Sequence, residues 1–137
     1  MPRVAAYGNW SSPLTIERVL AATRGLSDVA LDAADVLWLE TPPGQNGRQT
    51  VMRLHDGELV ELTPAPLCVR SRVNEYGGGA WSAREGQLVV CDDAAGRLWH
   101  RTPDGPLRPL TPESTALRFG EQRNARRADC LFRAWRW

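Results

Sequence analysis

The chain has 137 residues, among them 17 Arg, no Lys and 16 acidic residues, and 42% of its residues are hydrophobic, a composition typical of a globular domain. Its longest apolar runs contain four residues, against the roughly 18 that a membrane-spanning helix needs, which excludes such a helix. The three Cys cannot all pair in a disulfide framework and no signal-like apolar stretch follows Met1, so we expect a cytoplasmic protein.

The small net charge of +1 conceals an uneven distribution. Residues 1–117 carry 11 Arg and 14 acidic residues, a net charge of −3, whereas residues 118–137 carry six Arg and two acidic residues, a net charge of +4. An acidic body does not attract phosphate backbones. Trp135 and Trp137 lie among the Arg of the tail, but six Arg in a segment of mixed charge are a weak signal beside a dedicated basic patch. We therefore expect neither nucleic acid nor a membrane among the partners.

Residues 1–26 are predicted to form an N-terminal segment with one short helix. Ser12 would cap this helix and Pro13 would take its first position, followed by apolar residues at Ile16, Val19 and Leu20. We expect the helix to lie across the faces of the predicted sheets, as a lid or brace.

An internal repeat with an offset of 48 residues occupies the middle of the chain. Residues 55–64 read HDGELVELTP and residues 103–112 read PDGPLRPLTP, with Asp-Gly, Leu and Leu-Thr-Pro in register. Repeats of about 20 to 50 residues are typical of arrays and propellers.

Each repeat contains four short runs of β-branched or aromatic residues, separated by Gly, Asp, Asn or Pro, which predict β-strands. In the first unit, residues 27–66, the strands are expected at residues 29–33, 36–40, 50–54 and 58–62. In the second unit, residues 67–113, they are expected at residues 80–84, 88–91, 97–101 and 107–110. Pro106 and Pro109 flank or occupy the last strand, and because proline has no amide donor this strand is predicted at a sheet edge.

Four antiparallel strands in each repeat are the pattern of a propeller blade, so the predicted fold class is all-β. Four blades, the smallest common ring, would need about 192 residues at this period, and the chain has 137. We therefore expect an incomplete β-propeller of two four-stranded blades, from a fragment or a truncated reading frame. Residues 114–137 either begin a third blade or form an aberrant Arg-rich tail.

Motifs for catalysis, metal binding and phosphate binding do not occur in the sequence. There is no Gly-x-Ser-x-Gly, and the two candidate bases, His55 and His100, have no nucleophile nearby in the sequence. The Cys are separated by 22 and 38 residues, without the close pairs of a zinc site. Gly77, Gly78 and Gly79 are not followed by the Gly-Lys-Ser/Thr of a phosphate loop. We expect no catalytic residue, no metal and no cofactor.

A charged cluster precedes the first strand of the second unit and is the candidate substrate-binding site. It consists of Arg70, Arg72, Glu75 and Tyr76, followed directly by the three glycines. One interpretation is an Arg–Glu pair that joins two blades, because charged networks are often structural. The other is that Arg72, Glu75 and Tyr76 line the central channel and contact the charged ends of a peptide.

The order of several motifs resembles the N-terminal propeller of bacterial prolyl oligopeptidase family serine peptidases, in the branch of the acylaminoacyl peptidases and dipeptidyl aminopeptidases. The resemblance covers residues 7–119, and its most specific part reads RSRVNEYGGGAW at residues 70–81. Other parts of it read YGNWSSPLT at residues 7–15, LWLE at residues 37–40, GR at residues 47–48 and LTP at residues 110–112. Asn74 departs from the pattern, because many relatives have His there.

The resemblance implies a function that depends on a second domain. In that family the propeller precedes an α/β-hydrolase domain that supplies Ser, Asp and His, and the propeller gates and positions short peptides. None of those three positions lies in this chain, so we expect no peptidase activity from the chain alone and short peptides as partners of the intact enzyme. The alternative is a stand-alone interaction module in which several copies assemble a ring.

Overall fold

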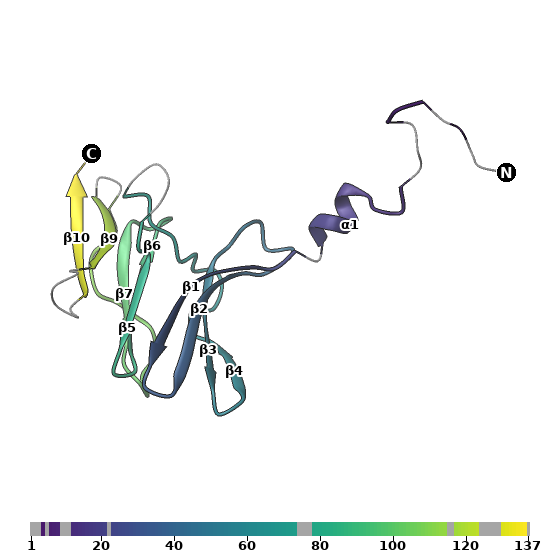
Figure 1. Cartoon of the computed structure of the whole chain (residues 1–137). Helices are drawn as coiled ribbons and strands as arrows, with labels where there is room; N and C mark the ends of the chain where they lie inside the picture. Colours follow the sequence, from purple (N-terminus) through teal and green to yellow (C-terminus); the bar gives the residue numbers. More distant parts are fainter. Residues whose placement is uncertain are drawn as a thin grey trace.

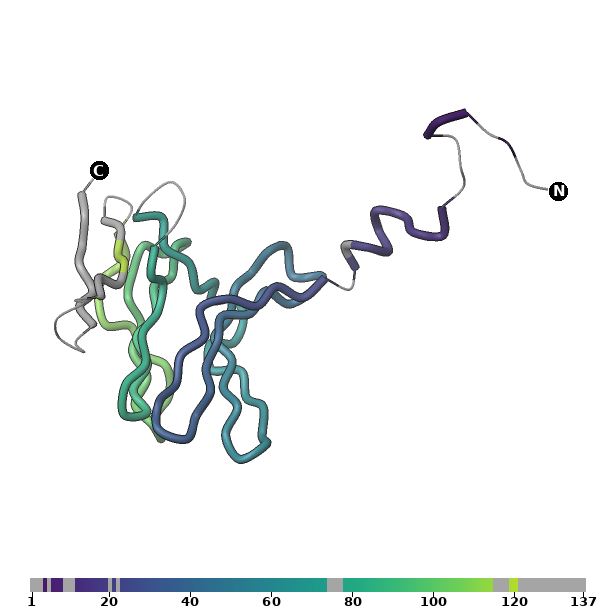
Figure 2. The backbone as a smooth tube through the Cα atoms, in the orientation of Figure 1, coloured from purple at the N-terminus to yellow at the C-terminus, as the bar shows by residue number. Residues whose placement is uncertain are grey.

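The computed structural model describes residues 4, 6–8, 12–21, 23–73, 78–114, 117–123 and 130–136. Three antiparallel sheets lie side by side, the second between the other two, and a short helix projects away from them (Figure 1). The path of the backbone from one sheet to the next follows the order of the sequence (Figure 2).

The first sheet, called blade 1, contains β1 (Gly25–Asp32), β2 (Asp35–Thr41), β3 (Thr50–His55) and β4 (Glu58–Glu61), in the order β1-β2-β3-β4. All four predicted strands are present. The first begins at Gly25 rather than at residue 29, because a register shift between Ser27 and Ala30 lets the strand pair on both sides of a bulge. Asp28 lies within this bulge with a φ of 50°.

The second sheet, called blade 2, contains β5 (Trp81–Arg84), β6 (Gln87–Asp92), β7 (Arg97–Arg101) and β8 (Arg108–Pro109), again in sequence order. The outermost strand is two residues long, shorter than the predicted residues 107–110. Pro109 is part of it and cannot donate to a ladder, and β8 has one neighbour, β7, which confirms the predicted edge position.

A third, two-stranded sheet contains β9 (Leu117–Arg123) and β10 (Cys130–Arg136), paired antiparallel. With the two four-stranded sheets it confirms the predicted all-β fold class and the incomplete propeller. The unit boundaries at residues 26, 66 and 113 stay predictions.

The repeated Leu-Thr-Pro sequence makes the same hydrogen bond in both blades. The hydroxyl of Thr63 accepts from the amide of Val51 at 2.8 Å, and the hydroxyl of Thr111 accepts from the amide of Leu98 at 3.0 Å. Each threonine side chain therefore continues the ladder at the point where the following proline ends the strand. The sequence repeat is thus also a repeat of one structural contact.

The main core lies between blades 1 and 2, where alternate residues of each strand face the other sheet. A smaller cluster lies between blade 2 and β9 and contains Cys91, Leu98 and Phe119. Each fully buried Val or Leu stabilises the fold by about 1.5–3 kcal/mol. Blade 2 is thus covered on both faces, whereas blade 1 contributes one face to the core. The buried residues of the main core are Leu37, Leu39, Val51, Leu62, Leu67, Val69, Ala80, Trp81, Leu88 and Val90.

A polar contact also joins the hairpin ends of the two blades. The carboxylate of Asp32, the last residue of β1, accepts from the amides of Glu85 at 2.8 Å and Gly86 at 2.7 Å. These two residues form the turn between β5 and β6, so one side chain of blade 1 holds a turn of blade 2.

The prediction of the helix cap was wrong. Helix α1 spans Ile16–Ala21, and the hydroxyl of Thr15 accepts from the amide of Arg18 at 3.2 Å, so Thr15 is the cap. The hydroxyl of Ser12 accepts from the amide two residues further on, at 3.0 Å. Ser12 and Pro13 therefore belong to a local turn that ends before the helix begins.

The predicted position of the helix was also wrong, because α1 does not lie across the sheets (Figure 1). Its apolar residues Ile16 and Val19 are exposed. Helical periodicity predicts which side of a helix is apolar, but a contact elsewhere in the molecule decides whether that side is covered. No helix in the described part of the chain is long and apolar enough to cross a membrane.

Candidate functional site

The segment between β4 and β5, which carries the predicted site, is attached to both blades. The amide of Val69 donates to the carbonyl of Gln49, directly before β3 of blade 1, at 2.8 Å, and Val69 forms an isolated antiparallel bridge with Asp92 in blade 2. The amide of Arg70 donates to the carbonyl of Cys91 at 3.1 Å. This part of the segment is therefore held in an extended conformation over the junction of the blades.

Extended conformation makes the side chains alternate between the interior and solvent. Ser71 is buried, and its hydroxyl donates to the carbonyl of Phe119 in β9 at 2.6 Å while it accepts from the amide of Val73 at 3.3 Å. A Cβ at Gly120 would lie 3.2 Å from this hydroxyl and 3.3 Å from Val73, so the close approach of β9 favours glycine there. The segment thereby contacts all three sheets, and Arg70 and Arg72 lie at its exposed positions.

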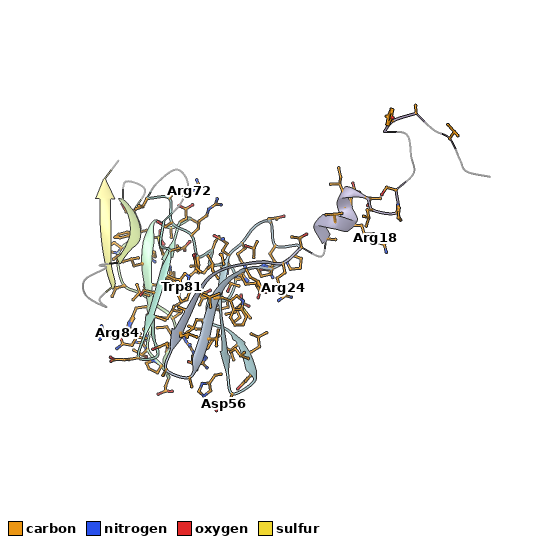
Figure 3. All side chains as sticks on the ribbon, in the orientation of Figure 1. Arg18, Arg24, Asp56, Arg72, Trp81 and Arg84 are labelled. Carbon is orange, nitrogen blue, oxygen red and sulfur yellow. The ribbon has the colours of Figure 1, made fainter. Side chains whose placement is uncertain are left out.

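Arg72 forms an ion pair with an acidic side chain of blade 2. Its Nε lies 2.8 Å from Oδ2 of Asp93, and the Arg72 side chain is 61% exposed while that of Asp93 is mostly buried. Arg70 makes no ion pair with a described residue. Figure 3 shows Arg72 at one end of the blades and Asp56 and Arg84 towards the other end, where Asp56 lies in a hairpin turn and Arg84 directly precedes one. Both arginines thus extend into solvent where the segment crosses between blades.

Glu75 and Tyr76, the other two predicted site residues, lie outside the described residues, as do Asn74 and Gly77. The predicted gathering of Arg72, Glu75 and Tyr76 therefore stays a prediction, and so does an Arg–Glu pair between blades. Asp93 was not anticipated from the sequence. Asp93 follows β6 directly, and it lies beside Arg72 because Val69 pairs with Asp92. This pairing joins residues far apart in the sequence, so no short-range pattern predicts it.

The two histidines lie in different blades and have different partners. Nδ1 of His55 contacts Oδ1 of Asp35, and Nε2 of His100 lies 3.0 Å from Oε1 of Gln87. Neither ring bonds a Ser, Thr or Cys side chain in the ranges that the structure describes. Over the same ranges, no three His, Cys, Asp or Glu side chains gather as a metal site requires.

Comparison with solved structures identifies what the two blades resemble. The chain is 32% identical to puromycin hydrolase over 92% of its own length, with a TM-score of 0.74. Its sequence and fold match the N-terminal propeller of prolyl oligopeptidase family peptidases. A puromycin-hydrolyzing peptidase from Mycobacterium tuberculosis is 36% identical over 83% of this chain, with a TM-score of 0.70. The family that the motifs indicated is thereby confirmed, whereas the predicted branch within the family stays a prediction.

A mutant of puromycin hydrolase, complexed with PGG, also matches, with 32% identity and a TM-score of 0.74. The chain spans about one fifth of the length of these structures, since it covers 21%, 19% and 21% of theirs. No protein-family model and no curated protein matches the chain.

Proposed function

We propose that this chain forms the part of a prolyl oligopeptidase family propeller that admits short peptides and positions them for hydrolysis. The observation that carries the proposal is the match to puromycin hydrolase over 92% of this chain at 32% identity. The complex of a mutant of that enzyme with PGG supports a peptide as the partner. The motifs at residues 7–15 and 70–81 favour the acylaminoacyl peptidase and dipeptidyl aminopeptidase branch.

Arg72 is the residue that we assign to peptide binding. Among the described residues Asp93 is the carboxylate that holds its guanidinium, through Nε, and the exposed remainder of the group is a donor for a peptide carboxylate or carbonyl. Arg70 adds a second positive charge on the same segment. Glu75 is assigned to a positively charged peptide end and Tyr76 to packing beside it.

We assign hydrolysis to a separate α/β-hydrolase domain, because residues 1–137 carry no Gly-x-Ser-x-Gly motif. A serine peptidase needs a nucleophile within reach of a base, together with donors for the oxyanion. In the intact enzyme an α/β-hydrolase domain supplies them, and the propeller restricts what reaches them. The chain alone therefore binds peptides weakly and does not cleave them.

A titration of the isotopically labelled chain with a tripeptide and its C-terminal amide, followed by NMR, tests this proposal. We expect chemical shift changes at residues 70–73 and 93, stronger for the free carboxylate than for the amide. Arg72→Ala should weaken binding about threefold to tenfold, because one exposed charge-assisted hydrogen bond is lost. Arg108→Ala, at an exposed position on β8, is the matched control and should bind like the unmodified chain.

Two results would contradict the proposal. One is binding that is unchanged in Arg72→Ala or equally weakened in Arg108→Ala. The other is turnover of puromycin or of aminoacyl chromogenic substrates by the purified chain, if a serine-directed inhibitor abolishes it.

A stand-alone interaction module, assembled as a ring from several copies, is a second candidate. The observation that favours it is the set of exposed apolar residues on β1, β3 and β4, among them Leu31 and Leu59. A discrete closed oligomer of more than two chains would support it.

A further inference from the structure

The loop between β2 and β3 contains an exposed Asn-Gly pair, Asn46 and Gly47. Their φ values are 51° and 75°, and the amide of Arg48 donates to the carbonyl of Gln45 at 2.9 Å. A turn that is closed by such a hydrogen bond and has positive φ at both central residues is of type I′, which Asn-Gly favours. The pair therefore occupies a tight turn on the surface of blade 1.

The two groups that can react with each other in this turn are not held by any described residue. The side-chain amide of Asn46 and the backbone amide of Gly47 make no hydrogen bond within the described ranges. A Cβ added at Gly47 would meet no atom within 4 Å, so open space surrounds the backbone there. An exposed turn with few contacts opens locally at a low free energy, which allows its groups to approach each other in new geometries.

We propose that Asn46 is a site of spontaneous deamidation, which converts it to isoaspartate and aspartate. The backbone nitrogen of Gly47 attacks Cγ of Asn46, the new C–N bond closes a cyclic succinimide, and the side-chain nitrogen leaves as ammonia with the proton of the Gly47 amide. Water then opens the ring. Cleavage between the ring nitrogen and the original backbone carbonyl gives isoaspartate, and cleavage between the nitrogen and Cγ gives aspartate. Water is the co-reactant, and nothing is oxidised or reduced.

Asn46 is distinguished from the other asparagines by the residue that follows it. Asparagine is a chemically labile residue in general, and the chain contains four. Asn9, Asn74 and Asn124 are followed by Trp, Glu and Ala. The Cβ of each of these residues hinders attack by the backbone nitrogen, whereas glycine has no Cβ. The sequence thus directs the reaction to Asn46.

Deamidation changes the turn that places Arg48. Nε of Arg48 donates to Oε1 of Gln45 at 2.6 Å, and Nη1 donates to the carbonyls of Thr63 and Leu67 after β4. Isoaspartate adds a carbon atom to the main chain inside the turn, so the hydrogen bond that closes the turn loses its geometry. Aspartate keeps the turn, because Asp tolerates positive φ as Asn does. We therefore expect isoaspartate, and not aspartate, to weaken the contacts of Arg48.

Incubation of the whole chain at mildly alkaline pH, followed by tryptic digestion and mass spectrometry, tests the modification. The peptide of residues 25–48 contains one asparagine, Asn46. We expect it to gain the mass difference between NH and O, with fragment ions that place the change at Asn46 rather than at Gln45. Methylation by an isoaspartate-specific methyltransferase should detect isoaspartate in excess of aspartate. The rate at Asn46 should exceed that at the other asparagines by on the order of tenfold or more.

Asn46→Gly is the matched variant, because glycine accepts the positive φ of the turn but has no side-chain amide. We expect the mass of its peptide and its midpoint of urea unfolding to stay the same during incubation. Chromatographically separated isoaspartate chains should unfold at a lower urea concentration than aspartate chains or unmodified chains. Asp56 and Gly57 form a turn with the same signs of φ, and they are an internal control because a carboxylate reacts more slowly than a carboxamide.

Three outcomes would overturn the proposal. The first is an unmodified Asn46 in the folded chain after a period in which a synthetic peptide of residues 41–50 deamidates. The second is a rate at Asn46 no greater than that at the other asparagines. The third is an equal urea midpoint for isoaspartate and unmodified chains, which would refute the effect on Arg48. The modification goes beyond the proposed peptide binding and does not depend on it, because mass and unfolding are measured without a peptide.

Discussion

Each guanidinium nitrogen of Arg48 donates a hydrogen bond at one end of blade 1. Nη1 donates to the carbonyls of Thr63 and Leu67, both at 3.1 Å, Nε to Gln45 at 2.6 Å, and Nη2 to Glu61 at 2.5 Å. One mostly buried side chain thus connects the loop before β3 with the segment after β4. This connection places the start of the segment that later carries Arg72.

Glu61 makes this connection dependent on pH. Partial burial raises the pKa of Glu61, but hydrogen bonds from Arg48 and Thr50 and the charge of Arg48 lower it, and the net shift is downward from 4.5. A carboxyl with a lowered pKa stabilises the fold above its unfolded value, and this contribution is lost as the pH falls through the folded value.

We therefore expect Glu61→Gln to reduce the free energy of unfolding near neutral pH by less than about 1 kcal/mol, since the Glu61 side chain is 38% exposed. The difference from the unmodified chain should shrink as the pH falls below 4.5 through the lowered pKa of folded Glu61, because the protonated carboxyl is then as uncharged as Gln. Urea unfolding at several pH values measures it. Glu58→Gln, at an exposed position of the same strand, is the control, and an equal pH dependence of that variant would contradict the prediction.

At the scale of elements, the two-residue turns decide how the hairpins close. Glu85 and Gly86 have φ values of 53° and 74°, and Asp56 and Gly57 have values of 47° and 82°. Such turns require positive φ at both positions, which favours Gly at the second. The turns differ in surroundings, because a Cβ on Gly86 would lie 2.9 Å from Pro103, whereas one on Gly57 would meet nothing within 4 Å.

Gly86→Ala should therefore destabilise the chain more than Gly57→Ala. Strain from positive φ costs each variant about 1 kcal/mol, and the clash with Pro103 adds about 1 kcal/mol at Gly86. The clash also displaces the amides that Asp32 holds. Urea unfolding of the two variants measures the difference, and equal losses of stability would show that the close approach of Pro103 to Gly86 costs nothing.

At the scale of the whole molecule, blades 1 and 2 share one core and should unfold together. Val90 is fully buried in this core and belongs to blade 2. Val90→Ala should lower the free energy of unfolding by about 2 kcal/mol through lost contacts and a cavity. Hydrogen exchange should show an equal loss of protection in β3 and β6. Leu110→Ala, at an exposed site, should cost under about 0.5 kcal/mol, and a loss confined to β6 would contradict a shared core.

Much of the fold could be predicted from short-range patterns. The eight strands of the two blades follow from runs of apolar residues between turn residues, and the Leu-Thr-Pro repeat marks equivalent positions in the blades. The predictions of the helix cap and of the start of β1 were wrong because the local sequence is compatible with more than one structure there. Ser12 and Thr15 are both good helix caps, and the chain uses Thr15; the bulge at Asp28 allowed β1 to begin four residues early.

The candidate site was predictable in part. Arg72 and its neighbours follow from the motif at residues 70–81, but Asp93 does not, because it approaches Arg72 through the pairing of Val69 with Asp92. Composition and periodicity were enough to establish strand identity, the repeat and the incomplete ring, because these depend on neighbours along the chain. Only the folded structure shows the Arg72–Asp93 pair, the hydrogen bonds of Asp32 to the turn between β5 and β6, and the exposure of one face of blade 1. Each of these depends on which residues far apart in the sequence come together.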